Sequence, residues 1–199
     1  KNEFLFFSEQ MKNIILFRRK LPNDKELIIK PLHLFRDIKT IHNWVNQPYA
    51  KSFWQMEGSV DDLYLHYEDF LNAGTGYSLM CFLEDKPIAQ VDYYKIATDE
   101  IKEHFDYRET DFGIHLLMGS YKKPVAHLSR DVMITALAFL FTLDIGRIVG
   151  EPDVRNKKAN KLVVDVGFSF IKAIQMSYKT ANLYLYDKTD FMNRYRDSL

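Results

Sequence analysis

Residues 151–168 read Glu-Pro-Asp-Val-Arg-Asn-Lys-Lys-Ala-Asn-Lys-Leu-Val-Val-Asp-Val-Gly-Phe. The β-branched pair Ile148-Val149 precedes this stretch and predicts a strand. Pro152 closes that strand, because proline has no N–H to donate to a strand ladder. The polar side chains that follow are therefore expected at the carboxyl end of a strand.

A helix is predicted inside the same stretch. Asn156 is a good N-cap, and Gly167 is typical of the left-handed residue that ends a helix. Apolar residues between them recur at i, i+3, i+4 and i+7, the pattern of a helix with one buried face. They are Ala159, Leu162, Val163 and Val166. The stretch thus predicts a strand, a helix and the start of a new strand.

A βαβ unit is predicted around this stretch. Residues 111–118 alternate between two faces as a strand does, and Ser129 is expected to cap an apolar helix that runs to Leu143. The crossover is expected to be right-handed, with its two strands parallel neighbours. The other expected elements are strands at 13–19 and 25–31, helices at 37–45 and 60–71, a hairpin of 76–83 and 88–95, a loop or short helix at 99–109, and a final antiparallel pair of 168–175 and 180–186. Ser59 is expected to cap the helix at 60–71.

Length, charge and cysteine content restrict the class of protein. A chain of 199 residues predicts a single domain, in which residues 1–26 form an N-terminal extension or hairpin. The formal net charge of zero argues against a nucleic-acid or membrane partner. Cys81 is the only cysteine, and no apolar run approaches the roughly 20 residues that span a bilayer. A cytoplasmic protein is expected, and no histidine or carboxylate set has metal-ligand spacing.

Three motifs in order resemble one protein family. They are residues 42–48 running on to 53–55 (His-Asn-Trp-Val-Asn-Gln-Pro and Phe-Trp-Gln), residues 110–117 (Thr-Asp-Phe-Gly-Ile-His-Leu-Leu) and residues 151–156 (Glu-Pro-Asp-Val-Arg-Asn). They resemble the GNAT superfamily of N-acyltransferases, in particular the branch that acylates hydroxylamines or amines in hydroxamate siderophore biosynthesis. The aerobactin, alcaligin and mycobactin acyltransferases typify that branch. The likeness covers roughly residues 28–186.

The resemblance implies a fold and a reaction. The fold is a GNAT-like α/β fold, with a mixed, splayed sheet of about seven strands and helices on both faces. The reaction is transfer of an acyl group, acetyl or longer, from acyl-CoA to the terminal hydroxylamine or amine of a lysine, ornithine or diamine derivative. A small-molecule acceptor is the expected partner, and other enzymes of the siderophore pathway are a further possibility.

The resemblance assigns catalysis to His115 and Asp153. An imidazole, with an ordinary pKa of about 6.5, suits the removal of a proton from an attacking nitrogen. Asp153 would orient the imidazole or take part in the proton transfer. From spacing alone, a core histidine bonded to a backbone carbonyl and a turn aspartate are the favoured readings, and the resemblance is what favours catalysis. Gly113, two residues before His115, is expected to leave space above the sheet for a ligand.

The start of the Ser129 helix is the expected site for the phosphates of coenzyme A, because helix N-termini carry free amides. The family loop is normally rich in glycine, yet residues 122–129 contain none. This departure indicates an altered phosphate-binding loop, a weaker affinity for coenzyme A or a lost activity. Asn156 is expected to bond the pantetheine amide as well as cap its helix. The full cofactor set is Leu117, Lys122, Lys123, Ala126, His127, Leu128, Ser129, Arg130 and Asn156.

The resemblance also assigns an acceptor pocket, although Trp44 is otherwise a core residue and Trp54 equally suits a packed flap. The pocket residues are His42, Trp44, Asn46, Trp54 and Gln55. Two other functions remain open. One is an aminoglycoside-type or other small-amine acetyltransferase, and the other is a relative that binds acyl-CoA or a partner without turnover.

Overall fold

The computed structural model describes residues 14–120 and 125–199. They form two compact units, one of Lys1–Asp92 and Leu116–Val125 and the other of Tyr93–His115 and Ala126–Leu199. We call these the first and the second unit; the single domain expected from the length stays a prediction. The weak pattern of residues 1–12 and the predicted ligands Lys122 and Lys123 lie outside the described residues.

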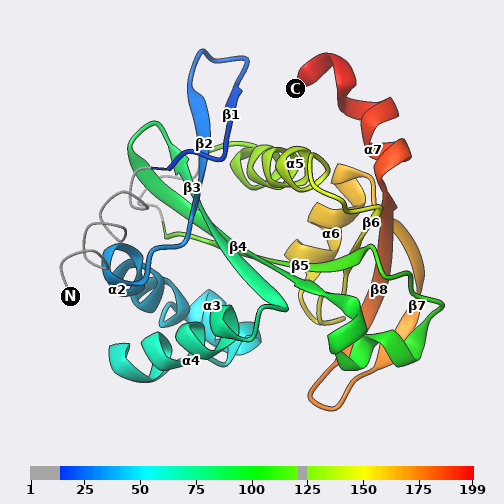
Figure 1. Cartoon of the computed structure of the whole chain (residues 1–199), viewed down its shortest axis with the longest axis horizontal. Coiled ribbons are helices and arrows are strands. Elements are labelled where there is room, and N and C mark those ends of the chain that lie inside the picture. The colour runs from blue at the N-terminus through cyan, green and yellow to red at the C-terminus, as the bar shows by residue number, and fades with distance from the viewer. Residues whose placement is uncertain (1–13, 121–124) are drawn as a thin grey trace. The chain divides into compact units, whose positions relative to one another are not determined.

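The first unit contains a run of antiparallel strands. β1 pairs with β2 and β2 pairs with β3, both antiparallel, and β4 is the next neighbour of β3 (Figure 1). Strands were expected in all four places. Their bounds are β1 Phe17–Lys20, β2 Glu26–Pro31, β3 Gly76–Leu83 and β4 Lys86–Lys95.

Within the described residues, the first unit also contains three helices: α2 (Leu34–Val45), α3 (Pro48–Trp54) and α4 (Val60–Asn72). The predicted cap Ser59 is confirmed, because its hydroxyl accepts from the Asp62 amide and the Asp62 carboxylate accepts from the Ser59 amide. The short α3 was not expected. Proline at its first position needs no N–H partner, so Pro48 begins a helix directly after α2 has ended.

The second unit contains the predicted βαβ unit. β5 (Asp111–Met118), which supplies residues to both units, pairs parallel with β6 (Arg147–Gly150), and the strand order runs β5-β6-β8-β7. β7 (Ser169–Gln175) and β8 (Thr180–Asp187) form the predicted antiparallel pair. With one parallel pair among antiparallel ones, the mixed α/β character is confirmed. The described residues hold eight strands rather than about seven.

The helices of the second unit are α5 (Leu128–Leu140), α6 (Lys157–Val166) and α7 (Lys188–Tyr195). The N-cap of α6 is confirmed, since Asn156 Oδ1 accepts from the Ala159 amide at 3.1 Å. Gly167 ends α6 with φ 124°, in the positive range that favours glycine. The predicted start of α5 was wrong by two residues, because His127 and not Ser129 is the N-cap, and the helix ends at Leu140 rather than Leu143.

Two of the three short 3-10 helices in the described residues and the C-terminal α7 had no predicted counterpart in the sequence, whereas the third lies in residues 99–109, where a loop or a short helix was expected. η1 (Ile96–Thr98) and η2 (Glu100–His104) follow β4, and η3 (Arg196–Ser198) follows α7. No helix among residues 14–120 and 125–199 has both the length and the apolar character needed to cross a bilayer.

The register of β5 and β6 determines which side chains share a face. Asp111 pairs with Arg147 and Gly113 with Val149, so alternate residues on the two strands point the same way. His115 continues this series on β5, and Glu151 follows directly after the end of β6. The register therefore brings a histidine and a carboxylate together at the carboxyl end of the parallel pair.

Candidate active site

His115 and Glu151 form a hydrogen-bonded pair. His115 Nε2 lies 2.5 Å from Glu151 Oε1, and the two side chains are 38% and 2% exposed. A carboxylate can only accept, so the imidazole donates through Nε2. In the neutral ring this arrangement leaves the lone pair on Nδ1. The imidazole is therefore oriented by a buried carboxylate while part of its surface reaches solvent.

Lys179 is the second cation at Glu151. Its Nζ donates to the same Oε1 at 3.3 Å, and its side chain is 14% exposed. Burial alone would raise the pKa of Glu151, but the charges and hydrogen bonds of His115 and Lys179 outweigh it and hold the pKa well below the ordinary value. Glu151 is thus a carboxylate that stays ionised despite its burial.

Tyr94 packs against the imidazole and fills the space beside Gly113. The Tyr94 and His115 rings lie 5.0 Å apart, and the Tyr94 hydroxyl is 3.4 Å from His115 Nε2. A Cβ at Gly113 would lie 2.2 Å from the Tyr94 ring. The expectation that Gly113 leaves room for a ligand was therefore wrong, because the glycine makes room for this tyrosine.

Asp153 is bound by Arg155. Its carboxylate accepts from the Arg155 backbone amide at 2.8 Å and from the guanidinium Nε and Nη2 at 2.9 and 2.7 Å. The hydrogen bond from the guanidinium is the main reason that the pKa of Asp153 is lowered. The carboxylate that is hydrogen-bonded to His115 belongs to Glu151, whereas the Asp153 carboxylate stabilises the turn that contains Arg155. A part for Asp153 in proton transfer stays a prediction.

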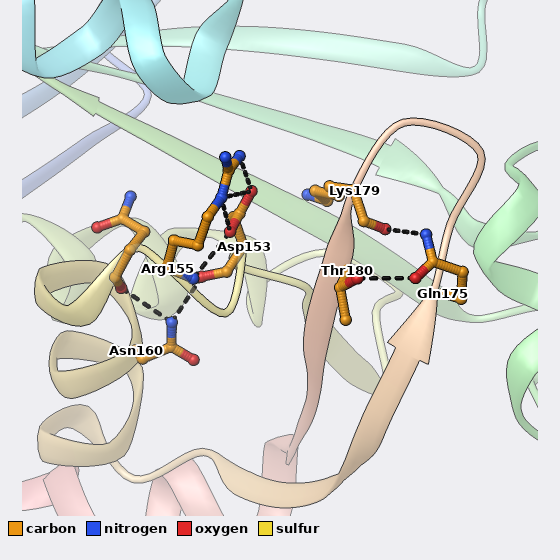
Figure 2. Close-up of polar contacts among 7 residues, drawn as sticks. Asp153, Arg155, Asn160, Gln175, Lys179 and Thr180 are labelled. Atoms are coloured by element: carbon orange, nitrogen blue, oxygen red, sulfur yellow. Dashed lines mark hydrogen bonds and ion pairs between the residues drawn. The ribbon is translucent and has the colours of Figure 1, made fainter.

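The turn after β6 faces the β7–β8 hairpin across a groove of about 480 Å³. The Val154 amide donates to the Thr180 carbonyl at 3.0 Å, which ties the turn to β8. In Figure 2 the Lys179 side chain extends from the hairpin toward the segment that carries Asp153 and Arg155. The groove is lined by Asp153, Val154, Arg155, Gln175, Ser177, Tyr178, Lys179 and Thr180.

The predicted coenzyme A residues that the structure describes in the second unit lie at two helix starts. Ala126 and His127 precede α5, and Leu128, Ser129 and Arg130 form its first turn. Asn156 caps α6. His127 has φ 62°, the left-handed conformation for which a glycine would be the least costly residue. The helix N-terminus is thus formed without the glycines that the family pattern led us to expect.

The first-turn residues of α5 differ in exposure. Leu128 is buried, whereas Arg130 is half-buried and stacks its guanidinium over the Tyr195 ring at 5.8 Å. Leu117, on β5, is buried. The backbone amides of residues 128–130 lie in the first turn, where no carbonyl of the helix can accept from them. This end of α5 fits an anion through backbone amides rather than through Leu128 or Leu117 side chains.

The predicted acceptor residues all belong to the first unit. Trp44 is buried in the cluster between α2 and α4, and Trp54 packs on that cluster from the end of α3. His42 Nε2 lies 2.7 Å from the Gly58 carbonyl, and the Asn46 side chain donates to the His42 carbonyl at 2.9 Å. Gln55 is exposed and ends α3 with φ 51°. Each of the five has a local structural role, and acceptor binding stays a prediction for all of them.

Sequence reasoning missed Glu151, Lys179 and Tyr94. In the sequence, Glu151 marked only the end of a strand. The signal that would have matched it to His115 is the parallel pairing of β5 and β6, which places side by side residues that are 36 apart in the chain. Lys179 lies in a hairpin turn, and no sequence pattern connects it with β6.

Cys81 is a buried core residue, and burial raises its pKa to about 12. No cluster of three potential metal-binding side chains occurs in the described parts of the chain.

Comparisons with known proteins agree with this architecture. A family model of the acetyltransferase (GNAT) domain matches residues 33–176. The N(6)-hydroxylysine O-acetyltransferase of Escherichia coli is 25% identical over 157 residues, 78% of this chain and 50% of that protein. The N-hydroxyputrescine acetyltransferase of Acinetobacter baumannii is 21% identical over 156 residues, 78% of this chain and 75% of that protein. The chain therefore spans half the length of the first relative.

Among solved structures, an uncharacterised protein from Bacillus halodurans matches with a TM-score of 0.84. The two are 24% identical, and the match covers 91% of this chain and 94% of the other. This likeness is evidence of the fold alone.

Proposed function

The chain belongs to the GNAT acetyltransferase family, and on that premise we propose that it is an acyl-CoA-dependent N-acyltransferase with His115 as its general base. The acceptor is the terminal hydroxylamine or amine of a lysine, ornithine or diamine derivative. The observation that carries the proposal is the His115–Glu151 pair, a partly exposed imidazole held by a buried carboxylate. The two curated relatives, named for hydroxylysine and hydroxyputrescine, support the acceptor class.

The imidazole performs the proton transfer. As the acceptor nitrogen bonds to the acyl carbon it must lose a proton, and Nδ1 of the neutral ring receives it. The C–S bond of the thioester breaks, and the departing thiolate takes up a proton and leaves as coenzyme A. The ring then carries a positive charge, which the ionised Glu151 stabilises through the Nε2 hydrogen bond. Lys179 keeps that carboxylate ionised, so Glu151 orients the ring without taking its proton. His115 is the proposed catalytic residue, and Glu151 and Lys179 are positioning residues.

Acyl-CoA supplies the thioester carbonyl that the acceptor nitrogen attacks. The N-terminus of α5 is the proposed receptor of its phosphates, because backbone amides and the helix dipole both favour an anion there. His127, the N-cap of α5, has a left-handed backbone conformation with φ 62°. Lys122, Lys123, Ala126, Ser129 and Arg130 complete the proposed contact, and Asn156 would serve the pantetheine arm.

The acceptor nitrogen determines how much the base must do. A hydroxylamine is far less basic than an alkylamine and is mostly neutral near pH 7, so the base receives its proton late. An ammonium of lysine type, with pKa about 10.4, must first lose a proton. His42, Trp44, Asn46, Trp54 and Gln55 are the proposed acceptor contacts from the first unit.

A thiol-release assay tests the function. Acetyl-CoA, succinyl-CoA and longer acyl-CoAs are supplied with N6-hydroxylysine, N5-hydroxyornithine, N-hydroxycadaverine or an aminoglycoside. Turnover is expected on a hydroxylamine and not on the aminoglycoside. Turnover on the aminoglycoside alone would favour a different small-amine acetyltransferase. Binding of acetyl-CoA without any turnover would favour a binding protein.

His115→Ala tests the base. Loss of a general base typically costs about 10²- to 10⁴-fold, so we expect kcat to fall by about that factor. His66→Ala is the matched control, because His66 is exposed on α4. Both variants are checked by thermal unfolding. Acylation at the wild-type rate by the His115 variant would exclude this histidine as the base.

A further inference from the structure

The groove between the Asp153 turn and the β7–β8 hairpin adjoins the proposed base. Lys179 lines the groove and donates to Glu151, which in turn accepts from His115. The groove therefore begins two hydrogen bonds away from the imidazole. Of this surface, the proton transfer described above uses Lys179 and makes no use of Arg155 or Tyr178.

The Asp153 and Gln175 side-chain oxygens in the groove are already occupied as hydrogen-bond acceptors. The Asp153 carboxylate accepts three N–H groups of Arg155. The side-chain oxygen of Gln175 accepts from the Thr180 hydroxyl at 2.7 Å, and its amide nitrogen donates to backbone carbonyls of the hairpin. Figure 2 shows both sets, one on each side of the groove. These groups organise the two walls and have little capacity left for a ligand.

The remaining capacity consists of donors. Arg155 has a 69% exposed side chain, and within the described part of the chain its Nη1 makes no hydrogen bond. The Lys179 ammonium has three hydrogens, of which one goes to Glu151. The Tyr178 hydroxyl has no hydrogen-bond partner among residues 14–120 and 125–199, and the Tyr178 ring lies 5.2 Å from Lys179 Nζ. Burial and three nearby carboxylates raise the pKa of Tyr178, so its hydroxyl remains a donor.

We propose that this groove binds a carboxylate at the remote end of the acceptor, so that the acceptor is an amino-acid derivative of lysine or ornithine type rather than a plain diamine. This inference rests on the proposed acyltransferase function. A guanidinium matches the two oxygens of a carboxylate, and Lys179 and Tyr178 add further donors. A diamine would instead bring its ammonium toward Arg155 and Lys179, where the acceptors are already taken.

N6-hydroxylysine and N-hydroxycadaverine test the proposal as a matched pair. They share the reacting nitrogen and the carbon chain, and they differ by the α-carboxylate. With acetyl-CoA, we expect the wild type to favour hydroxylysine by about 10²-fold in kcat/KM, because a site built around a polar group rejects the analogue that lacks it. In Arg155→Gln the ratio is expected to fall at least tenfold, and Arg155→Lys should restore part of it.

Lys158→Gln is the control, since Lys158 is an exposed cation of α6 outside the groove. It should keep the wild-type ratio, and thermal unfolding of every variant separates a specificity change from a folding defect. A wild-type ratio near one would overturn the proposal. So would an unchanged ratio in Arg155→Gln.

A binding measurement separates this proposal from the proposed function. Calorimetric titration of lysine and cadaverine into the protein with coenzyme A requires no turnover. Preferential binding of lysine that is lost in Arg155→Gln, together with no turnover of either hydroxylamine, would support the carboxylate site and contradict the acyltransferase. Equal binding of the two ligands would contradict the site even if turnover occurs.

Discussion

The parallel strands β5 and β6 carry a charged pair at each end, on the same face. At the start of the strands Asp111 is bound by Arg147, with Oδ2 and Nη2 2.6 Å apart and Oδ1 and Nε 3.1 Å apart. At the carboxyl end His115 is bound to Glu151. The sequence separation is the same, 36 residues, because both pairs follow one register.

The two pairs differ in the cation and in its exposure. Arg147 is permanently charged and buried, its Nη2 also donates to the Asp106 carbonyl, and its guanidinium stacks over Phe105 at 5.5 Å. His115 is partly exposed, and an imidazole, unlike a guanidinium, can serve as a proton acceptor. The same strand geometry thus gives a structural pair where the cation is a buried arginine and the proposed catalytic pair where the partner is an accessible imidazole.

Replacement of Arg147 by methionine is expected to have the largest effect on stability. The variant leaves the buried Asp111 carboxylate without the arginine that neutralises its charge. Removal of one partner of a buried ion pair typically lowers the free energy of unfolding by about 3 to 5 kcal/mol. Urea denaturation measures it. The double variant Asp111→Asn/Arg147→Met should recover part of the loss. If Arg147→Met lowers the free energy of unfolding by less than about 1 kcal/mol, the Asp111–Arg147 ion pair does not stabilise this end of the strands.

Glu151→Gln tests the reactive end. It keeps the shape of the side chain and removes the charge that stabilises the imidazolium, so we expect kcat to fall by about 10- to 100-fold, roughly 1.4 to 2.7 kcal/mol in the barrier. Glu109→Gln, an exposed glutamate of the same unit, is the control. A fall no larger than that of the control would remove Glu151 from the mechanism.

The same variant carries a pH prediction. The pKa of Glu151 is lower in the folded protein than its ordinary value of about 4.3, so its ionised form stabilises the fold above that pH. This contribution is lost as the pH falls below about 4. The difference in unfolding free energy between wild type and Glu151→Gln should therefore be largest at neutral pH and shrink on acidification. A difference independent of pH would contradict the assignment.

Asp153→Asn is expected to have the smallest effect on activity. If Glu151 orients the imidazole and Asp153 only organises the turn through Arg155, then kcat should fall less than about fivefold in the thiol-release assay. Asp144→Asn, an exposed aspartate before β6, serves as the control. A loss as large as that of His115→Ala would instead return the proton-transfer role to Asp153.

Local sequence determined the elements of this protein. The strand of residues 111–118, the Asn156 cap, the Gly167 helix end and the Ser59 cap were all predicted, because each depends on side chains within a few residues of one another. The motifs around His115 and Asn156 also identified the family, since the residues in them are contiguous in the chain.

Only the tertiary structure decided which residues act together. The partner of His115 depends on the register of two strands separated by a helix, and the sequence contains both Glu151 and Asp153 as candidates two residues apart. A one-residue shift in a strand turns a side chain to the opposite face, so composition and periodicity cannot choose between pairings. Lys179 reaches Glu151 from a hairpin 28 residues later, and Tyr94 fills the space beside Gly113 from another strand. These contacts arise from packing between distant segments, which local preferences do not encode.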